Sequence, residues 1–251
     1  MSGAGTAVGG WAARRFWTRA EARPGDTGWQ VFLDGRALRT PGKQPLHLPT
    51  EGLAIAIAAE WQAQADLIRP ETMPQTRAAN SAIERVTPQR AEVASMLADY
   101  ATTDLLSHRA AHPHDLVEAQ AREWQPLLDW AGTRFGATLT VTEGIMPVAQ
   151  DPQALARLAQ AVAGFGPFGL TALHDLVTLP GSLILGLAVT EGRLSASESH
   201  RLSRLDEDHQ AAHWGRDEEA EAAAEARLTA MCAAETLWTL LAPARDGGLA
   251  P

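Results

Sequence analysis

The spacing of apolar residues changes near residue 49, and this change limits the possible folds more than any other feature. Before Pro49, apolar and polar residues largely alternate, with the period of two that is typical of β-strands. After it, Leu53, Ile57 and Trp61 recur at about the helical period of 3.6 residues. The sequence therefore predicts an α+β fold, in which a small β-rich or mixed N-terminal part precedes a predominantly α-helical bundle.

The predicted organisation follows from this change of period. We expect a β-rich N-terminal region over residues 11–48 and a mainly helical domain over residues 49–243. Residues 137–143 alternate as a strand does, and this strand is predicted to return to the N-terminal sheet. The two ends, 1–10 and 244–251, are rich in small residues and are predicted to be flexible.

Local signals predict where several elements turn, break or end. Asp34-Gly35 lies between two extended runs and predicts a tight hairpin, because Gly tolerates positive φ. Pro126 should break or kink the helix that contains it, since proline has no backbone N–H. A further helix should begin after Ser195, with a capping box, and should run to about His213.

Charge and composition exclude several classes of protein. The formal net charge of −9 is opposite in sign to that of a nucleic-acid binder or a protein that binds an anionic membrane surface. The longest apolar stretch, LPGSLILGLAV, is far shorter than the roughly 20 residues of a membrane helix, so no membrane insertion is expected. Cys232 is the only cysteine, which excludes an internal disulfide and fits a cytoplasmic protein.

The segment RLDEDHQAAHWGRDEE, residues 204–219, concentrates the negative charge. Between Asp206 and Glu225 there are eight acidic residues against Arg216 alone. Such a run is either a solvated helix face or a surface that docks onto another protein. Trp214 lies inside this segment, and a tryptophan there is either an interface anchor or a lid over the protein's own core.

His209 and His213 support a different hypothesis, a metal-dependent hydrolase. At a spacing of four they project from one helix face, as the zinc ligands of metalloproteases do. Gln210, however, stands where those enzymes carry the general base Glu, and so the two histidines are also expected as ordinary surface or interface residues. Asp115 is expected at the start of another helix, where the dipole favours a carboxylate. A third metal ligand is predicted among nearby acids, namely Asp206, Glu207 or Asp217.

Several stretches, taken in order, resemble a known family: the assembly chaperones of F-type ATP synthase, which hold the unassembled alpha subunit of its catalytic head. They cover the chain from about residue 15 to about residue 240. No single one of them is decisive, but the ordered set is specific. The stretches are RFW, VFLDGRALRTPGKQPLHLPT, LAIAIAAEWQAQ, IRPETMPQTRAANSAIERV, YATTDLL, LTALHDLVTLPGSLILGLA and SRLDEDHQAAHWGRDEEAE.

The resemblance implies a binding protein that is not an enzyme and uses no cofactor. It would shield the interface of the alpha subunit until the beta subunit replaces it, and would be a monomer when free. The first segment lacks the Arg- and Ser-rich character of a mitochondrial transit peptide, which favours a bacterial member. Trp61, next to Glu60, matches a family position but also lies on an apolar stripe typical of a core residue. The partner-binding positions that the resemblance implies are Asp206, Glu207, Trp214, Gly215, Glu218 and Trp61.

Overall fold

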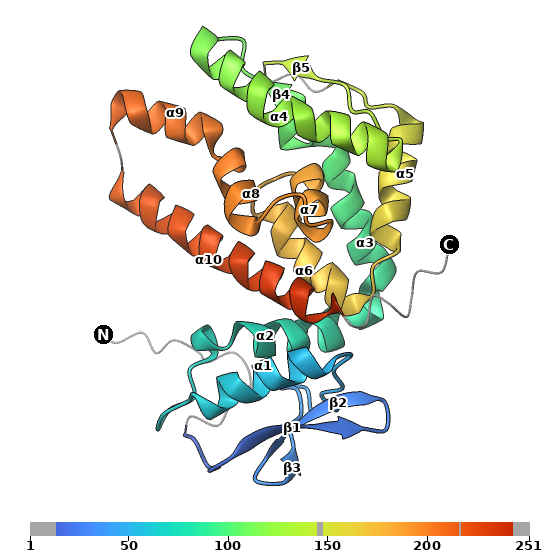
Figure 1. Cartoon of the computed structure of the whole chain (residues 1–251), viewed down its shortest axis with the longest axis vertical. Helices are drawn as coiled ribbons and strands as arrows, with labels where there is room; N and C mark the ends of the chain where they lie inside the picture. Colours follow the sequence, from blue (N-terminus) through green and yellow to red (C-terminus); the bar gives the residue numbers. More distant parts are fainter. Residues whose placement is uncertain (1–13, 145–147, 216, 243–251) are drawn as a thin grey trace, which may run out of the picture. The chain divides into compact units, whose positions relative to one another are not determined.

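The computed structural model describes residues 14–144, 148–215 and 217–242 (Figure 1). The chain forms two compact units, one of Met1–Pro88 with Thr239–Pro251 and one of Gln89–Trp238. A small sheet precedes the helices, which confirms the predicted α+β class. The termini predicted to be flexible, 1–10 and 244–251, lie outside the described residues.

The first unit contains a small antiparallel sheet in the order β1-β2-β3. The predicted hairpin is confirmed: Asp34 and Gly35 connect β2 to β3, and both have positive φ, 46° and 80°, as a primed turn requires. β1 is an additional strand that pairs along the whole length of β2. The elements of this unit are β1 (Ala20–Gly25), β2 (Gly28–Leu33), β3 (Arg36–Ala37), α1 (Glu51–Gln62) and α2 (Pro74–Ser81).

Helix α1 packs against β1 and β2 through its apolar stripe. Thr50 begins it by accepting a hydrogen bond from the backbone N–H of Leu53 at 3.3 Å. The predicted boundary at 48/49 marks the change from strand to helix, whereas the first compact unit continues to Pro88. The reason is physical: α1 packs against β1 and β2, so the sheet and this helix share one core.

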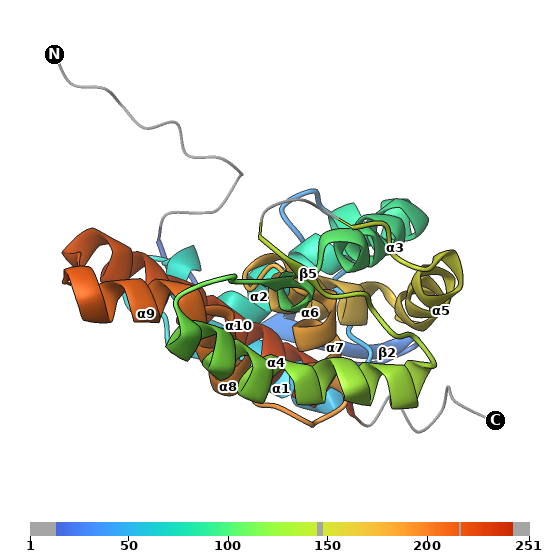
Figure 2. The same ribbon diagram turned by 90° about the horizontal axis from the view of Figure 1, so that it is seen from above.

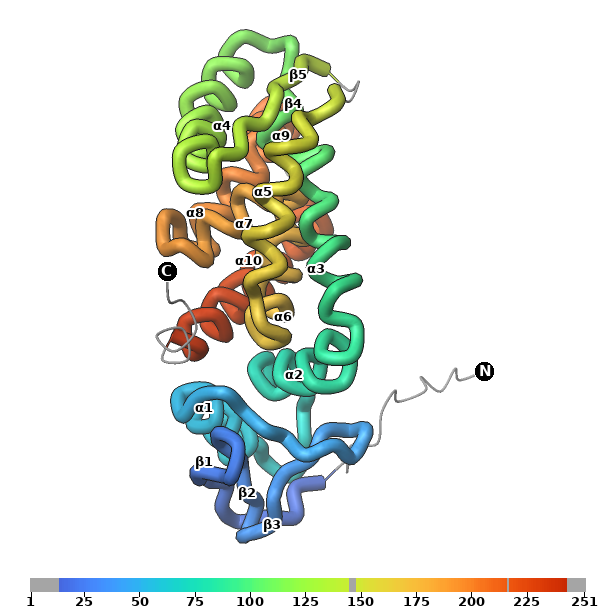
Figure 3. Tube along the Cα trace, turned by 90° about the vertical axis from the view of Figure 1, so that its right-hand side faces the viewer, coloured from blue at the N-terminus to red at the C-terminus, as the bar shows by residue number. Residues whose placement is uncertain are grey.

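The second unit is almost entirely helical. Helices α3 and α5 pack side by side, as Figure 3 shows, and α6 packs against α7. None of the described helices is both long and apolar enough to cross a bilayer. The elements are α3 (Arg90–Asp99), β4 (His108–Arg109), α4 (His114–Phe135), β5 (Thr142–Glu143), α5 (Pro152–Ala163), α6 (Pro167–Thr178), α7 (Leu183–Thr190), α8 (Ala196–Ser203), α9 (Leu205–Trp214) and α10 (Glu218–Leu240).

The core of this unit is centred on α7, all of whose residues are buried. Its N-terminus is satisfied by Ser182, whose hydroxyl accepts from Leu185 N–H, and by the buried carboxylate of Asp104, which accepts from Ile184 N–H at 3.0 Å. Gly186 lets α6 approach closely, because a Cβ there would lie 2.5 Å from a methyl group of Val177. Close packing of two apolar helices therefore depends on one missing side chain.

Three sequence predictions for the second unit are corrected by the structure. Helix α4 continues through the exposed Pro126, so of the two predicted outcomes, a break or a kink, the break does not occur, because proline removes only one of the hydrogen bonds of a long helix. β5 pairs in parallel with β4, so the prediction that residues 137–143 return to the N-terminal sheet is wrong. The helix predicted from Ser195 to His213 is interrupted at Arg204, which separates α8 from α9.

Candidate functional site

The acidic segment folds into two helices joined at Gly215. Helix α9 ends there, with the N–H of Gly215 donating to the carbonyl of Ala211, and a φ of 96° favours glycine. The acids lie mainly in the first turns of the two helices, where the positive end of each helix dipole stabilises them. These residues are Asp206, Glu207 and Asp208 in α9 and Glu218, Glu219 and Glu221 in α10.

Arg204 ties α9 to the start of α10. Its side chain is only 10% exposed, and its guanidinium lies 2.8 Å from a carboxylate oxygen of Glu207 and 3.1 Å from one of Asp208. It also lies 3.4 Å from the carboxylate of Glu221. Glu207, Asp208 and Glu221 therefore form ion pairs within the protein itself. Arg204 was not among the predicted site residues, although its spacing of three and four from Glu207 and Asp208 is a signal for these ion pairs.

A groove of about 880 Å³ lies between α9 and α10 and reaches the end of α8. Figures 1 and 2 show how these three helices are arranged. Its apolar surface comes from alanines and Leu228, and its charged residues are four acids and one arginine, a formal charge of −4 + 1 = −3. His200 does not offset this, because burial, followed by the nearby Arg204 charge, lowers its pKa. The lining residues are His200, Arg204, Asp208, Ala211, Ala212, Glu218, Glu221, Ala222, Ala224, Glu225 and Leu228.

Trp214 ends α9 beside this groove and is 89% exposed. A lid over the protein's own core would be largely buried, so this exposure excludes the interpretation of Trp214 as such a lid. Within the described chain, Glu218 and Glu225 form no ion pair, so these groove carboxylates differ from Glu207 and Asp208, which Arg204 engages.

Asp206 and Trp61, which were also predicted to bind a partner, contact other residues of this chain. Asp206 accepts a hydrogen bond from the side-chain amide of Gln120 at 2.5 Å, which links α9 to α4. Trp61 belongs to the first unit, is 6% exposed, and packs against Trp17 with ring centroids 5.0 Å apart. It is a core residue in this structure, and the structure does not group it with the acidic segment.

Glu60, the neighbour of Trp61, also has a structural explanation. Its carboxylate accepts from the N–H groups of Gln75 and Thr76, at 2.7 and 2.8 Å, in the first turn of α2. Burial raises its pKa, while the hydrogen bonds from Thr76 and Gln75 act in the opposite direction. The Glu-Trp pair thus joins α1 to α2 and fills the core of the first unit.

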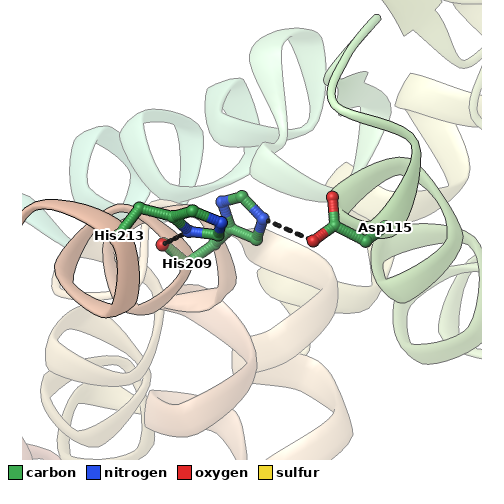
Figure 4. A group of neighbouring side chains, drawn as sticks. All are labelled: Asp115, His209 and His213. Atoms are coloured by element: carbon green, nitrogen blue, oxygen red, sulfur yellow. Dashed lines mark hydrogen bonds and ion pairs between the residues drawn. The ribbon is translucent and has the colours of Figure 1, made fainter.

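His209 and His213 meet a carboxylate, but not one of the three that the sequence suggested. Asp115, in the first turn of α4, lies 3.0 Å from Nε2 of His209 through its Oδ2 atom (Figure 4). One possible ligand atom from each of the three residues lies within 4.8 Å of the others. Neither Asp206, Glu207 nor Asp217 belongs to this cluster. Residues 94 positions apart in sequence, such as Asp115 and His209, cannot be paired by local spacing.

Known proteins of similar sequence and structure identify the family. The ATP12 chaperone protein family matches residues 14–132. Atp12 from Paracoccus denitrificans is 60% identical, with a TM-score of 0.89 over 91% of this chain and 98% of that chain. The Atu1473 protein from Agrobacterium tumefaciens is 37% identical, with a TM-score of 0.87 over 91% of this chain and 86% of that chain.

A more distant relative agrees with these. Protein atp12, mitochondrial, from Schizosaccharomyces pombe is 25% identical over 219 residues, which are 82% of this chain and 75% of that protein. The match at 60% identity covers 91% of this chain, which is more than either compact unit contains alone. The chain therefore belongs to the ATP12 chaperone family.

Proposed function

We propose that this protein is an assembly chaperone of F-type ATP synthase that binds the unassembled alpha subunit. It shields the subunit interface of that client until the beta subunit replaces it. Family membership supports a chaperone of ATP synthase assembly. The observation that carries the proposal for this surface is the groove between α9 and α10, which is acidic, partly apolar, and flanked by an exposed tryptophan.

The groove suits a client segment that is both basic and apolar. Alanine methyl groups and Leu228 offer an apolar surface to client side chains, while Glu218 and Glu225 offer carboxylates to Lys or Arg. Charges of this kind mainly set orientation and association rate. Trp214 would supply the large contact that dominates affinity in many interfaces. A stable complex of standard size buries about 1,600 Å², so the groove is one part of a larger surface.

The proposed action is binding without catalysis. The protein would act in the cytoplasm of a bacterium, as a monomer when free, without a cofactor, without membrane insertion and without binding nucleic acid. A metal-dependent hydrolase using His209 and His213 is not supported: the family is one of chaperones, and Gln210 occupies the position of the general base in the comparable protease motif.

Charge reversal in the groove tests the proposal. In the double variant E218K/E225K, capture of the purified alpha subunit should weaken about tenfold, which is about 1.4 kcal/mol, because attraction is replaced by repulsion. Binding is measured by surface-immobilised titration, and folding by circular dichroism. Reversal of Glu218 should cost stability only about 0.3–1 kcal/mol through the helix dipole. Glu207 is not a suitable site, because its ion pairs with Arg204 and Arg227 stabilise the fold.

A matched control separates the groove from net charge. The variant E92K/E143K makes the same change in net charge at two exposed acids of the second unit that do not line the groove. It should capture the alpha subunit as the natural sequence does. Equal weakening by both double variants would remove the groove from the proposal. Equal capture of an unrelated unfolded protein would replace a specific chaperone with a nonspecific one.

A further inference from the structure

Three side chains with metal-ligating atoms meet where α9 lies against the first turn of α4 (Figure 4). His209 and His213 come from one face of α9, four residues apart, and Asp115 comes from α4. Histidine nitrogen and carboxylate oxygen are both ligands that zinc accepts. The cluster lies outside the groove between α9 and α10, whose lining includes none of the three.

The spacing of the ligand atoms is close to that of a metal site. Tetrahedral coordination with bonds of about 2.0–2.2 Å places neighbouring ligand atoms about 3.3 Å apart. His209 Nε2 and Asp115 Oδ2 are 3.0 Å apart, and the three ligand atoms lie within 4.8 Å of one another. His213 and Asp115 are both exposed, so their side chains can rotate by the remaining distance without disturbing a core.

The hydrogen bond of His213 prepares its other nitrogen for a metal. Its Nδ1 lies 2.8 Å from the backbone carbonyl oxygen of His209. A carbonyl only accepts, so Nδ1 must carry the proton, and Nε2 is left with a lone pair. Metal-binding histidines commonly have their second nitrogen bonded to a backbone carbonyl in this way. His213 is therefore held in the tautomer that a metal ion requires.

Helix α9 is also an element that a metal ion would stabilise. None of its residues is buried, so apolar packing contributes little to its position. Its contacts with α4 are polar, through Asp206 with Gln120 and His209 with Asp115. An ion bound by Asp115 of α4 and by both histidines of α9 would link the two helices through three coordinate bonds in place of one hydrogen bond.

We propose that Asp115, His209 and His213 bind one divalent transition-metal ion, for which zinc is the best match, and that this ion fastens α9 to α4. The role is structural, since Gln210 cannot act as a general base. Imidazole is a poor ligand for hard ions such as magnesium, so magnesium should not compete with zinc for this site. None of the three side chains lines the groove proposed for the client, so metal binding and client binding can be tested separately.

Titration of the metal-free, untagged full chain with zinc sulfate tests the proposal. Calorimetry should find one ion bound per chain. The variants H213A and D115N should each weaken the affinity at least about tenfold, as the loss of a single supporting residue already does in zinc sites. H174A is the matched control, because His174 is another exposed histidine 2.8 Å from a carboxylate, that of Asp175. It should bind zinc as the natural sequence does.

Hydrogen exchange provides a second measurement that does not depend on affinity alone. Zinc should slow amide exchange over residues 205–214 in the natural sequence and should have no such effect in H213A. Because His213 is exposed, the variant H213A should fold as the natural sequence does, and circular dichroism checks this directly. Equal affinity of H213A and the natural sequence, or zinc binding without slower exchange in α9, would overturn the proposal.

Discussion

At the scale of single residues, Trp214 adds little to the core of the fold, and its proposed role is to contact a partner. Its indole is 89% exposed at the end of α9, where water covers apolar surface that folding would otherwise bury. An exposed aromatic residue next to an acidic groove is the usual form of an interface anchor.

The variant W214A should therefore lose affinity for the alpha subunit without losing stability. We expect a cost of at least about 2 kcal/mol in binding, which is roughly 30-fold in Kd, if Trp214 is an anchor. The thermal midpoint should not change, because the side chain is not part of the core. I55A is a control, since Ile55 is also a large exposed apolar residue. A lowered thermal midpoint in W214A would contradict the partner role.

Asp104 is a residue placed for the fold. Its buried carboxylate accepts hydrogen bonds from Ser182 Oγ at 2.7 Å and from Ile184 N–H at 3.0 Å, at the start of α7. Burial raises its pKa to about 6, above the ordinary value of 3.8 for Asp, although the hydrogen bonds oppose this shift. The folded protein therefore binds a proton at a pH where the unfolded chain does not.

This shift predicts the pH dependence of stability. Between pH values near 6 and near 4, the folded state carries one more proton at Asp104 than the unfolded state. The contribution of Asp104 to the free energy of unfolding should increase as pH falls through this window, by at most about 1.4 kcal/mol per pH unit. Denaturant titrations should show that the stability difference between the natural sequence and D104N grows on acidification. A difference that is independent of pH would refute the assignment.

At the scale of elements, α9 is held by polar contacts at its N-terminal end. Arg204 precedes it and joins it to α10 through Glu221, while Gln120 of α4 binds Asp206. Interior helices such as α7 instead owe their position to buried apolar side chains. Helices without buried residues open more readily, so α9 should be among the less protected parts of the second unit.

Removal of the arginine should loosen this helix selectively. In R204A, amide exchange over residues 205–214 should become about tenfold faster, since ion pairs of a buried arginine with half-exposed carboxylates contribute about 1–2 kcal/mol. Exchange in α7 should be unchanged. R201A is the matched control, because Arg201 pairs with Glu123 at 2.9 Å but does not line the groove. Equal acceleration in both variants would show that Arg204 has no special part in fastening α9.

At the scale of the whole molecule, charge is distributed unevenly. The net charge is −9, and the segment from Asp206 to Glu225 carries eight of the 30 acidic residues with one arginine. A concentrated field of this kind accelerates encounter with a basic partner and is screened by salt. The same excess of acids is consistent with the exclusion of nucleic acid as a partner.

The rate of association with the alpha subunit should therefore depend on ionic strength. Screening lengths fall from about 10 Å at 0.1 M salt to about 3 Å at 1 M, so the association rate constant should fall several-fold over this range. The dissociation rate constant should change much less, because it reflects short-range contacts. Stopped-flow measurements separate the two. A salt effect confined to dissociation would contradict electrostatic steering by the acidic segment.

Local patterns in the sequence determined the elements. The change of period at Pro49, the Asp34-Gly35 turn, the capping box at Ser195 and a helix end near His213 are all confirmed. Each depends on residues within one turn or one hairpin. The resemblance to ATP synthase assembly chaperones, which rested on ordered stretches along the chain, is confirmed at the level of the family.

Contacts between distant residues were decided only by the tertiary structure. Spacing alone could not show that Asp115 meets His209, that Glu221 pairs with Arg204, or that β5 joins β4. Nor could it show that Trp61 is buried and Trp214 exposed, since both lie on helices beside charged residues. Hydrophobic spacing specifies which face of an element turns inward, whereas the neighbour that a side chain meets depends on how the elements pack.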